Sequence, residues 1–322
     1  MFFSIIVPLY NRPQEIDELL HSLTKQQYKN FEVLIIEDGS FWDAKKIVER
    51  YHSQLNVSYY FKKNEGQGFA RNFGFELAKG DYFIVFDSDC LIPENYLTVV
   101  YNRLISDYLD AYGGPDAAHP SFTSIQKAIS YAMTSLFTTG GIRGNKKHIG
   151  QFHPRSFNMG ISKEVWEQTR GYAITRMGED IEFSIRIHKQ GFKIGLIPEA
   201  YVYHKRRTNF KQFFKQLHFF GRARINIYRF FPAELKFVHF FPALFVLFSI
   251  ITLLSNVSKT PFANYLNFLL GIYVLVLFAD ALIKTRSLMV AVLSTIAAFV
   301  QLIAYGLGFI QELITLQYKK SR

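Results

Sequence analysis

The chain has one cysteine among its 322 residues and fewer acidic than basic side chains. The single thiol, Cys90, excludes an intrachain disulfide, and no spacing of cysteine and histidine typical of a zinc site is present. The acids number 26 Asp and Glu against 37 Lys and Arg, which gives a formal net charge of +11. Much of this excess lies in one segment near residue 220, so nucleic acid is not needed as a partner, and no motif supports one.

The N-terminus also lacks the basic region that precedes the apolar part of a signal peptide. Pro8 and Tyr10 cut short the apolar run that follows Met1. We therefore expect this run to be a β-strand and not a signal peptide.

Charge is missing from three long stretches in the last third of the chain. Phe237–Ser258 and Ser287–Gln311 carry no acid, lysine or arginine, and Thr260–Ile283 carries only Asp280. Each stretch reaches the ~20 residues that cross a bilayer, so we predict a transmembrane region over residues 237–311 with three spans. The helices of a soluble bundle would each show a polar face. Asp280 and Lys284 are spaced for an ion pair at the membrane interface, which we favour over a proton relay.

Basic and aromatic residues alternate in the segment before these spans. Lys205–Lys236 contains nine Lys or Arg residues and one acid, Glu234. Apolar residues recur there at helical spacing, and basic residues fall on another face: Phe210, Phe213, Phe214, Leu217 and Phe220 against Lys211, Lys215 and Arg222. We predict that residues 206–236 form an amphipathic helix at the membrane interface that is attracted by anionic lipid. A helix packed on the N-terminal sheet with a solvated basic face is the alternative.

Apolar runs in the first 205 residues each end in polar residues. Strands are expected over Phe2–Tyr10, Phe31–Ile36, Val57–Phe61 and Tyr82–Phe86, with helices between them. Strands that alternate with helices predict an α/β fold with a mostly parallel, right-handed sheet. Ligands of such sheets bind at the carboxyl ends of the strands.

Two aspartates follow the apolar run of Tyr82–Phe86. Side chains alternate along an extended chain, so Asp87 and Asp89 would point the same way and could share a divalent cation. Such a cation would hold a diphosphate. The alternative is an Asp-Ser-Asp turn that only ends the strand.

Two further acids precede a predicted helix over Ile181–Gln190. Asp180 at the start of that helix could accept a proton from a bound hydroxyl, and Glu179 beside it is the second catalytic candidate. Both acids could also be helix caps. His204 follows a strand-like Tyr201–Tyr203 and is either a further metal or phosphate ligand or a structural residue. Arg206 and Arg207, which come next, could neutralise departing phosphates.

Five segments, matched in order and spacing, resemble the family 2 glycosyltransferases with the GT-A (Rossmann-like) fold: SIIVPLYNRP, FEVLIIEDGS, NEGQGFARNFG, GDYFIVFDSDC and MGEDIEFSIRI. The resemblance covers roughly the first 205 residues. It implies inverting transfer of a sugar from a nucleotide-diphosphate donor, assisted by Mg²⁺ or Mn²⁺.

The resemblance also assigns roles to residues. Pro8, Tyr10 and Asp38 would line the nucleobase pocket, and Arg71 would lie near the nucleotide. Asp87 and Asp89 would hold the ribose and the metal, and Asp180 would be the base. The stretch of residues 140–157 is expected to form a loop over the site.

Together these observations predict a membrane-anchored inverting glycosyltransferase with four regions. Residues 1–205 would be the cytosolic GT-A domain, 206–236 the interface segment, 237–311 the transmembrane region and 312–322 a basic tail. The donor is expected to be a UDP-sugar, and the acceptor a lipid-linked or cell-surface glycan. A polyprenyl-phosphate glycosyl synthase and a non-catalytic nucleotide-sugar-binding scaffold remain alternatives. A processive synthase is disfavoured because no Gln-x-x-Arg-Trp sequence is present.

The basic flank before the first span favours the cytoplasmic side of the inner membrane for the catalytic domain. With three spans, the basic tail Lys319–Arg322 would then lie outside, against the positive-inside tendency. Either one apolar segment is a re-entrant hairpin, or upstream charges overrule the charges of the tail.

Overall fold

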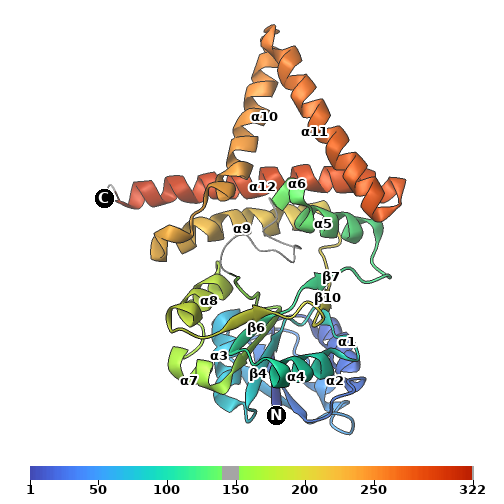
Figure 1. Cartoon of the computed structure of the whole chain (residues 1–322), viewed down its shortest axis with the longest axis vertical. Helices are drawn as coiled ribbons and strands as arrows, with labels where there is room; N and C mark the ends of the chain where they lie inside the picture. Colours follow the sequence, from blue (N-terminus) through green and yellow to red (C-terminus); the bar gives the residue numbers. More distant parts are fainter. Residues whose placement is uncertain (140–151, 321–322) are drawn as a thin grey trace. The chain divides into compact units, whose positions relative to one another are not determined.

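The computed structural model describes residues 1–139 and 152–320, which divide into two compact units (Figure 1). The first unit comprises Met1–His119 and Gly150–Lys205. The second comprises Pro120–Ile149 and Arg206–Arg322. Most of the loop predicted over residues 140–157 lies outside the described residues. The sequence did not indicate that the segment beginning at Pro120 groups with the C-terminal helices.

A seven-stranded sheet forms the centre of the first unit, in the order β3-β2-β1-β4-β8-β6-β9. Its strands are β1 Phe3–Leu9, β2 Phe31–Asp38, β3 Val57–Lys62, β4 Tyr82–Phe86, β6 Ala111–Gly113, β8 Asn158–Ser162 and β9 Ile194–Leu196. All neighbouring strands are parallel except β8, which runs antiparallel to β4 and β6. The prediction of a mostly parallel α/β sheet is confirmed.

Helices cover both faces of this sheet because side chains of each central strand alternate between two cores. In β1, Ile5 and Val7 enter one core, whereas Ile6 enters the other. The first core receives α1 Pro13–Thr24, α2 Lys45–Glu49 and α4 Tyr96–Ser106. The second receives α3 Gln67–Leu77, α7 Lys163–Thr169 and α8 Glu179–Lys189. The two sets of helices leave the carboxyl ends of the strands as the edge where polar residues collect.

A small three-stranded sheet adjoins that edge. It has the order β5-β10-β7, formed by Cys90–Leu91, Val202–His204 and Asp116–Ala117. Strand β10 pairs antiparallel with β5, which sets His204 opposite Cys90. This pairing brings the end of the unit back to the turn that follows β4.

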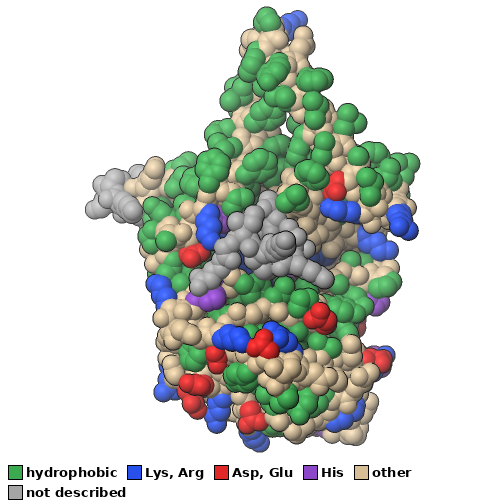
Figure 2. Space-filling view, in the orientation of Figure 1, with side chains coloured by type: hydrophobic (Ala, Val, Ile, Leu, Met, Phe, Trp, Pro, Cys, Tyr) green, Lys and Arg blue, Asp and Glu red, His purple; other side chains and the backbone are tan. Residues whose placement is uncertain are grey.

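The second unit is entirely helical in its described residues. Its helices are α5 Ser124–Thr134, α6 Leu136–Thr139, α9 Phe210–Phe230, α10 Phe241–Val257, α11 Phe262–Thr285 and α12 Leu288–Lys320. Within the described part of the chain, three stretches are long and apolar enough to cross a membrane: Phe237–Val257, Phe262–Thr285 and Leu288–Gln317. Hydrophobic side chains cover the surfaces of α10 and α11 (Figure 2). The prediction of three apolar helices is confirmed in length and composition.

Helix α9 uses its apolar face to pack against α5 and α12. Phe213 and Leu217 are buried in a cluster with Ala128 of α5 and with Ala297 and Ala304 of α12. Helix α9 thus forms where the amphipathic helix is predicted, and part of its apolar face is covered by helices of the same unit. Its place at the membrane interface stays a prediction.

Two glycines let α9 and α12 approach at backbone distance. A Cβ at Gly221 of α9 would lie 2.1 Å from the carbonyl oxygen of Tyr305, and one at Gly308 of α12 would lie 2.0 Å from that of His218. A methyl group at either position must therefore push the helices apart. Gly271 of α11, by contrast, has nothing within 4 Å of its Cβ position.

We expect Gly308→Ala to destabilise the helical unit and Gly271→Ala to leave it unchanged or slightly more stable. Forcing a methyl group into a packed interface costs about 1–3 kcal/mol, whereas alanine favours a free helix position. Thermal unfolding of the full chain in detergent, followed by circular dichroism, measures both. Equal midpoints for the two variants would contradict the close approach of α9 and α12.

Candidate active site

The strands β1, β2 and β4 end side by side, and each is followed by polar residues. Asn11 and Arg12 follow β1, Asp38 ends β2, and Asp87 follows β4. Because the three strands are parallel neighbours, these residues meet at one edge of the sheet. This is the position at which the sequence predicts a ligand site.

The two aspartates after β4 lie on a turn and do not point the same way. The strand ends at Phe86, and the amide of Cys90 donates to the carbonyl of Asp87 at 3.1 Å. Asp87 accepts a hydrogen bond from Nη2 of Arg71 at 2.7 Å, and Asp89 turns to other partners. The regular alternation of side chains ends at Phe86, so it does not determine whether Asp87 and Asp89 share a cation. The roles of Asp87 and Asp89 in ribose and metal binding stay predictions.

Asp89 is buried against two partners from distant parts of the unit. Its Oδ2 accepts from Nη1 of Arg12 at 2.8 Å, and its Oδ1 lies 3.0 Å from Nε2 of His204. The amide of Lys205 also donates to the Asp89 carbonyl at 3.0 Å. Burial alone would raise the pKa of Asp89, but the interactions with His204 and Arg12 outweigh it and hold that pKa below its usual range. The carboxylate is thus ionised at neutral pH, as a cation ligand must be.

The side chains around Asp89 fit a divalent cation. Ligand atoms of Asp89, Cys90 and His204 all lie within 4.8 Å of one another. Burial raises the pKa of the Cys90 thiol, which stays protonated and donates to the carbonyl of Phe157 at 3.6 Å. A carboxylate oxygen and an imidazole nitrogen remain, and both are common ligands of divalent cations. Asp89 and His204 are therefore the residues that would hold the cation.

Arg71 of α3 is fully buried behind the Asp87 turn. Besides Asp87, its guanidinium faces Glu179, with Nη1 and Oε1 3.6 Å apart, and its carbon lies 5.4 Å from the ring centre of Tyr172. The side chain of Arg71 has no exposed surface, and its predicted place near the nucleotide stays a prediction. What Arg71 does in the structure is join the turn after β4 to the start of α8.

The two acids at the start of α8 have different surroundings. Glu179 is 5% exposed, and its carboxylate contacts Gln67 and Arg71. Burial, and then the neighbouring Asp180, raise the pKa of Glu179, and Arg71 only partly offsets this. The side chain of Asp180 is 18% exposed and pairs with Nη1 of Arg155 at 3.2 Å. Asp180 is thus the more exposed of the two acids, and helix α8 confirms its predicted place at a helix N-terminus.

The carboxylate of Asp38 forms its hydrogen bonds within the protein. Its carboxylate accepts from the amides of Glu65 at 3.0 Å and Gly66 at 2.8 Å and from Nζ of Lys62 at 3.1 Å. These bonds join the end of β2 to the loop that opens α3. The nucleobase role of Asp38 stays a prediction.

The remaining predicted donor residues fall in three places. Pro8 lies in β1 beside Ile36 of β2, and the side chain of Tyr10 is 46% exposed just beyond the strand. Arg206 and Arg207 belong to the second unit, and their assignment to the donor also stays a prediction.

Sequence reasoning missed three residues of the site: Arg12, Gln67 and Arg155. Each belongs to or adjoins a segment that attracted notice, since Arg12 lies in the stretch after β1 and Gln67 opens α3. Their partners, however, are 77, 112 and 25 residues away in the chain. Only the tertiary structure brings such pairs together.

The chain belongs to glycosyl transferase family 2, which matches residues 4–168. The strand order and the polar sheet edge agree with the GT-A fold expected for this family.

Two related proteins show sequence similarity over different lengths of the chain. An uncharacterized glycosyltransferase of Rickettsia bellii is 37% identical over 94 residues, which are 29% of this chain and only 14% of that protein. The dolichyl N-acetyl-alpha-D-glucosaminyl phosphate 3-beta-D-2,3-diacetamido-2,3-dideoxy-beta-D-glucuronosyltransferase of Methanococcus voltae is 26% identical over 319 residues, 95% of each chain.

A solved structure shares the fold over almost the whole length. The mannosyltransferase PcManGT from Pyrobaculum calidifontis, in complex with GDP-Man and Mn²⁺, superposes with a TM-score of 0.66 at 16% sequence identity. The superposition covers 97% of this chain and 86% of that one.

We expect Arg71→Met to destabilise the first unit by about 3–5 kcal/mol, because it leaves two carboxylates without their buried partner. Arg50→Met is the matched control, since Arg50 pairs with Asp17 at 2.9 Å on the surface and such pairs contribute about 0–1 kcal/mol. Thermal unfolding followed by tryptophan fluorescence reports this unit, which contains both tryptophans, Trp42 and Trp166. Similar midpoints for the two variants would show that Arg71 is not the buried link.

Proposed function

We propose that the chain is a membrane-anchored inverting glycosyltransferase that moves a sugar from a nucleotide-diphosphate donor to a lipid-linked or glycan acceptor. Family membership supports the reaction class. The observation that carries the proposal is that two acids near the sheet edge differ in burial and in their partners. Asp89 is buried and ionised beside His204, while Asp180 is reachable at a helix N-terminus.

The arrangement supports a single displacement. The acceptor hydroxyl oxygen would attack the anomeric carbon of the donor while the bond from that carbon to the diphosphate oxygen breaks. The nucleoside diphosphate leaves with the electron pair, and the hydroxyl proton passes to Asp180. A divalent cation held by Asp89 and His204 would neutralise charge on the departing diphosphate. Arg71 would position both sides of the site through Asp87 and Glu179.

Two observations support the proposed lipid-linked acceptor: the apolar helices of this chain and the name of one relative. The Methanococcus voltae relative is named for a dolichyl-linked sugar phosphate, and this chain has three apolar helices after its catalytic unit. An acceptor that lives in the bilayer suits such an anchor. We expect a UDP-sugar as donor and the cytoplasmic face of the inner membrane as location. A polyprenyl-phosphate glycosyl synthase is the second candidate, since a bare lipid phosphate would also be met at the bilayer surface.

The test of the donor side is release of nucleotide from a panel of sugar nucleotides by purified full-length protein in detergent with Mn²⁺. We expect turnover of one donor, loss of activity in EDTA, and a fall of about 100-fold or more in Asp89→Asn, because that change removes the charge that holds the cation. Asp43→Asn, at an exposed acid in the loop after β2, is the control and should retain activity. Full activity of Asp89→Asn would overturn the assignment. Binding of a donor without any turnover on acceptor lipids would favour a scaffold.

A second test separates binding from chemistry. We expect Asp180→Asn to bind donor nucleotide with unchanged affinity in calorimetry while transfer falls about 100- to 10,000-fold, because the base acts on the acceptor hydroxyl. Glu167→Gln, at an exposed acid on α7, should change neither quantity. If Asp180→Asn keeps its transfer rate and Glu179→Gln loses it, the base is the buried neighbour instead.

A further inference from the structure

Helix α9 carries a charge density that a membrane interior does not accept. Its 21 residues include five cations and no acid. The cations are Lys211, Lys215, Arg222, Arg224 and Arg229. Lysine and arginine in the hydrocarbon core are costly, so a helix with this composition stays in water or at the headgroup level.

Helix α12 packs along much of α9, side by side and in the same chain direction. Near the start of α9, Phe213 and Leu217 share a buried cluster with Ala297 and Ala304. Further along, Gly221 meets Tyr305 and Gly308 meets His218 at backbone distance.

Ion pairs continue this contact to the end of α9. Glu312 is buried, with its carboxylate 2.9 Å from Nε of Arg222 and 2.7 Å from Nη2 of Arg229. The contact therefore extends from the first turns of α9 to its last turn. If α12 crossed the bilayer, α9 and its five cations would have to enter the core beside it.

The lengths of the helices also indicate that α12 differs from α10 and α11. Helix α10 continues a short helical turn, and the apolar stretch Phe237–Val257 that they form has 21 residues, or about 32 Å. Helix α11 has 24 residues, or about 36 Å, so both can span a core of about 30 Å. Helix α12 has 33 residues, or about 50 Å, far more than a crossing needs. Within this unit, α10 and α11 form a hairpin, and α12 runs crosswise to it, along α9 (Figure 1).

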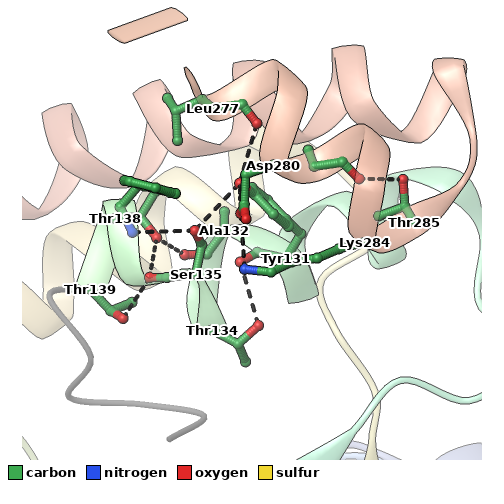
Figure 3. Close-up of polar contacts among 12 residues, drawn as sticks. Tyr131, Ala132, Thr134, Ser135, Thr138, Thr139, Leu277, Asp280, Lys284 and Thr285 are labelled. Carbon is green, nitrogen blue, oxygen red and sulfur yellow. Dashed lines mark hydrogen bonds and ion pairs between the residues drawn. The ribbon is translucent and has the colours of Figure 1, made fainter. Parts of the chain in front are cut away.

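A polar cluster marks where α11 leaves the apolar region. Near the end of α11, Asp280 accepts from the Tyr131 hydroxyl at 2.6 Å and from Nζ of Lys284 at 2.9 Å (Figure 3). The ion pair expected from the sequence is thus confirmed, with Tyr131 as an added partner. Tyr131 belongs to α5, and α5 also packs against the first half of α12 through Ala128 and Ile129. The level of Asp280 on α11 is therefore the level at which α5, α12 and α9 lie.

From these contacts we propose that only α10 and α11 cross the bilayer. Helix α12 lies with α9 and α5 along the headgroup region, on the side of the membrane from which α10 enters. Two crossings return the chain to the side on which it started. The basic tail Lys319–Arg322 then lies on the same side as the cations of α9, which removes the conflict with the positive-inside tendency. This inference does not depend on the proposed enzymatic reaction.

Single added cysteines in the full chain test the proposal. Lys259→Cys lies between α10 and α11, Gln317→Cys lies near the end of α12, and His52→Cys is an exposed reference position on the catalytic unit. The native Cys90 is buried and serves as the background. Each variant is labelled with a membrane-impermeant maleimide in right-side-out and in inverted membrane vesicles.

We expect Gln317→Cys to react in the same vesicle orientation as His52→Cys, and Lys259→Cys in the opposite one. A third crossing would instead make Gln317→Cys react together with Lys259→Cys, which would overturn the proposal.

A depth measurement tests the in-plane position of α12 separately. Spin labels replace its outward-facing residues Val292, Ile296, Leu307 and Ile314, one at a time, in nanodiscs that contain anionic lipid. We expect similar, shallow depths for all four, because a helix in the plane of the interface keeps one level. A profile that passes through the bilayer centre would contradict the proposal even if the cysteine labelling agreed.

Discussion

The candidate active site depends on one buried cation. Arg71 lies behind the sheet edge with no exposed surface, between Asp87 on the turn after β4 and Glu179 at the start of α8. A guanidinium taken out of water is tolerable only when its charge is met by acids. Here those acids are supplied by two of the five segments that resemble the family, and the cation by a third. The ion pairs of Arg71 thus give the three motifs a common position, which separate surface contacts would not.

A second constraint concerns the acid that would hold the cation. Asp89 owes its ionised state to Arg12 and His204, which reach it from opposite ends of the first unit. The pairing of β10 with β5 is what sets His204 in place, so a short two-residue strand has a direct effect on the chemistry of the site. The division between a buried acid at the turn and a reachable acid on α8 follows from the same packing.

In the helical unit, the positive charge of α9 limits where its neighbour α12 can lie in the membrane. By hydropathy alone α10, α11 and α12 are equivalent, since each contains a stretch long and apolar enough to cross a membrane. They differ in their neighbours. Helices α10 and α11 present most of their surface outward, whereas α12 packs along α9, which carries five cations, and buries Glu312 between two of them. An apolar helix can therefore belong to the surface of a membrane when the helix it packs against cannot enter.

The sequence by itself determined the fold class, because hydrophobic periodicity and strand-end polar residues are local properties. The buried runs of β2 and β4, the amphipathic character of α9 and the place of Asp180 at a helix start could all be predicted. So could the ion pair of Asp280 with Lys284, whose spacing is one helical turn. Only the tertiary structure decided that Asp87 and Asp89 diverge on a turn, that Arg71 faces inward, and that Arg12 and Gln67 join the site. It also decided that part of the apolar face of α9 packs against α5 and α12. These features depend on pairs far apart in the chain, and their distances are set by packing, which no local pattern encodes.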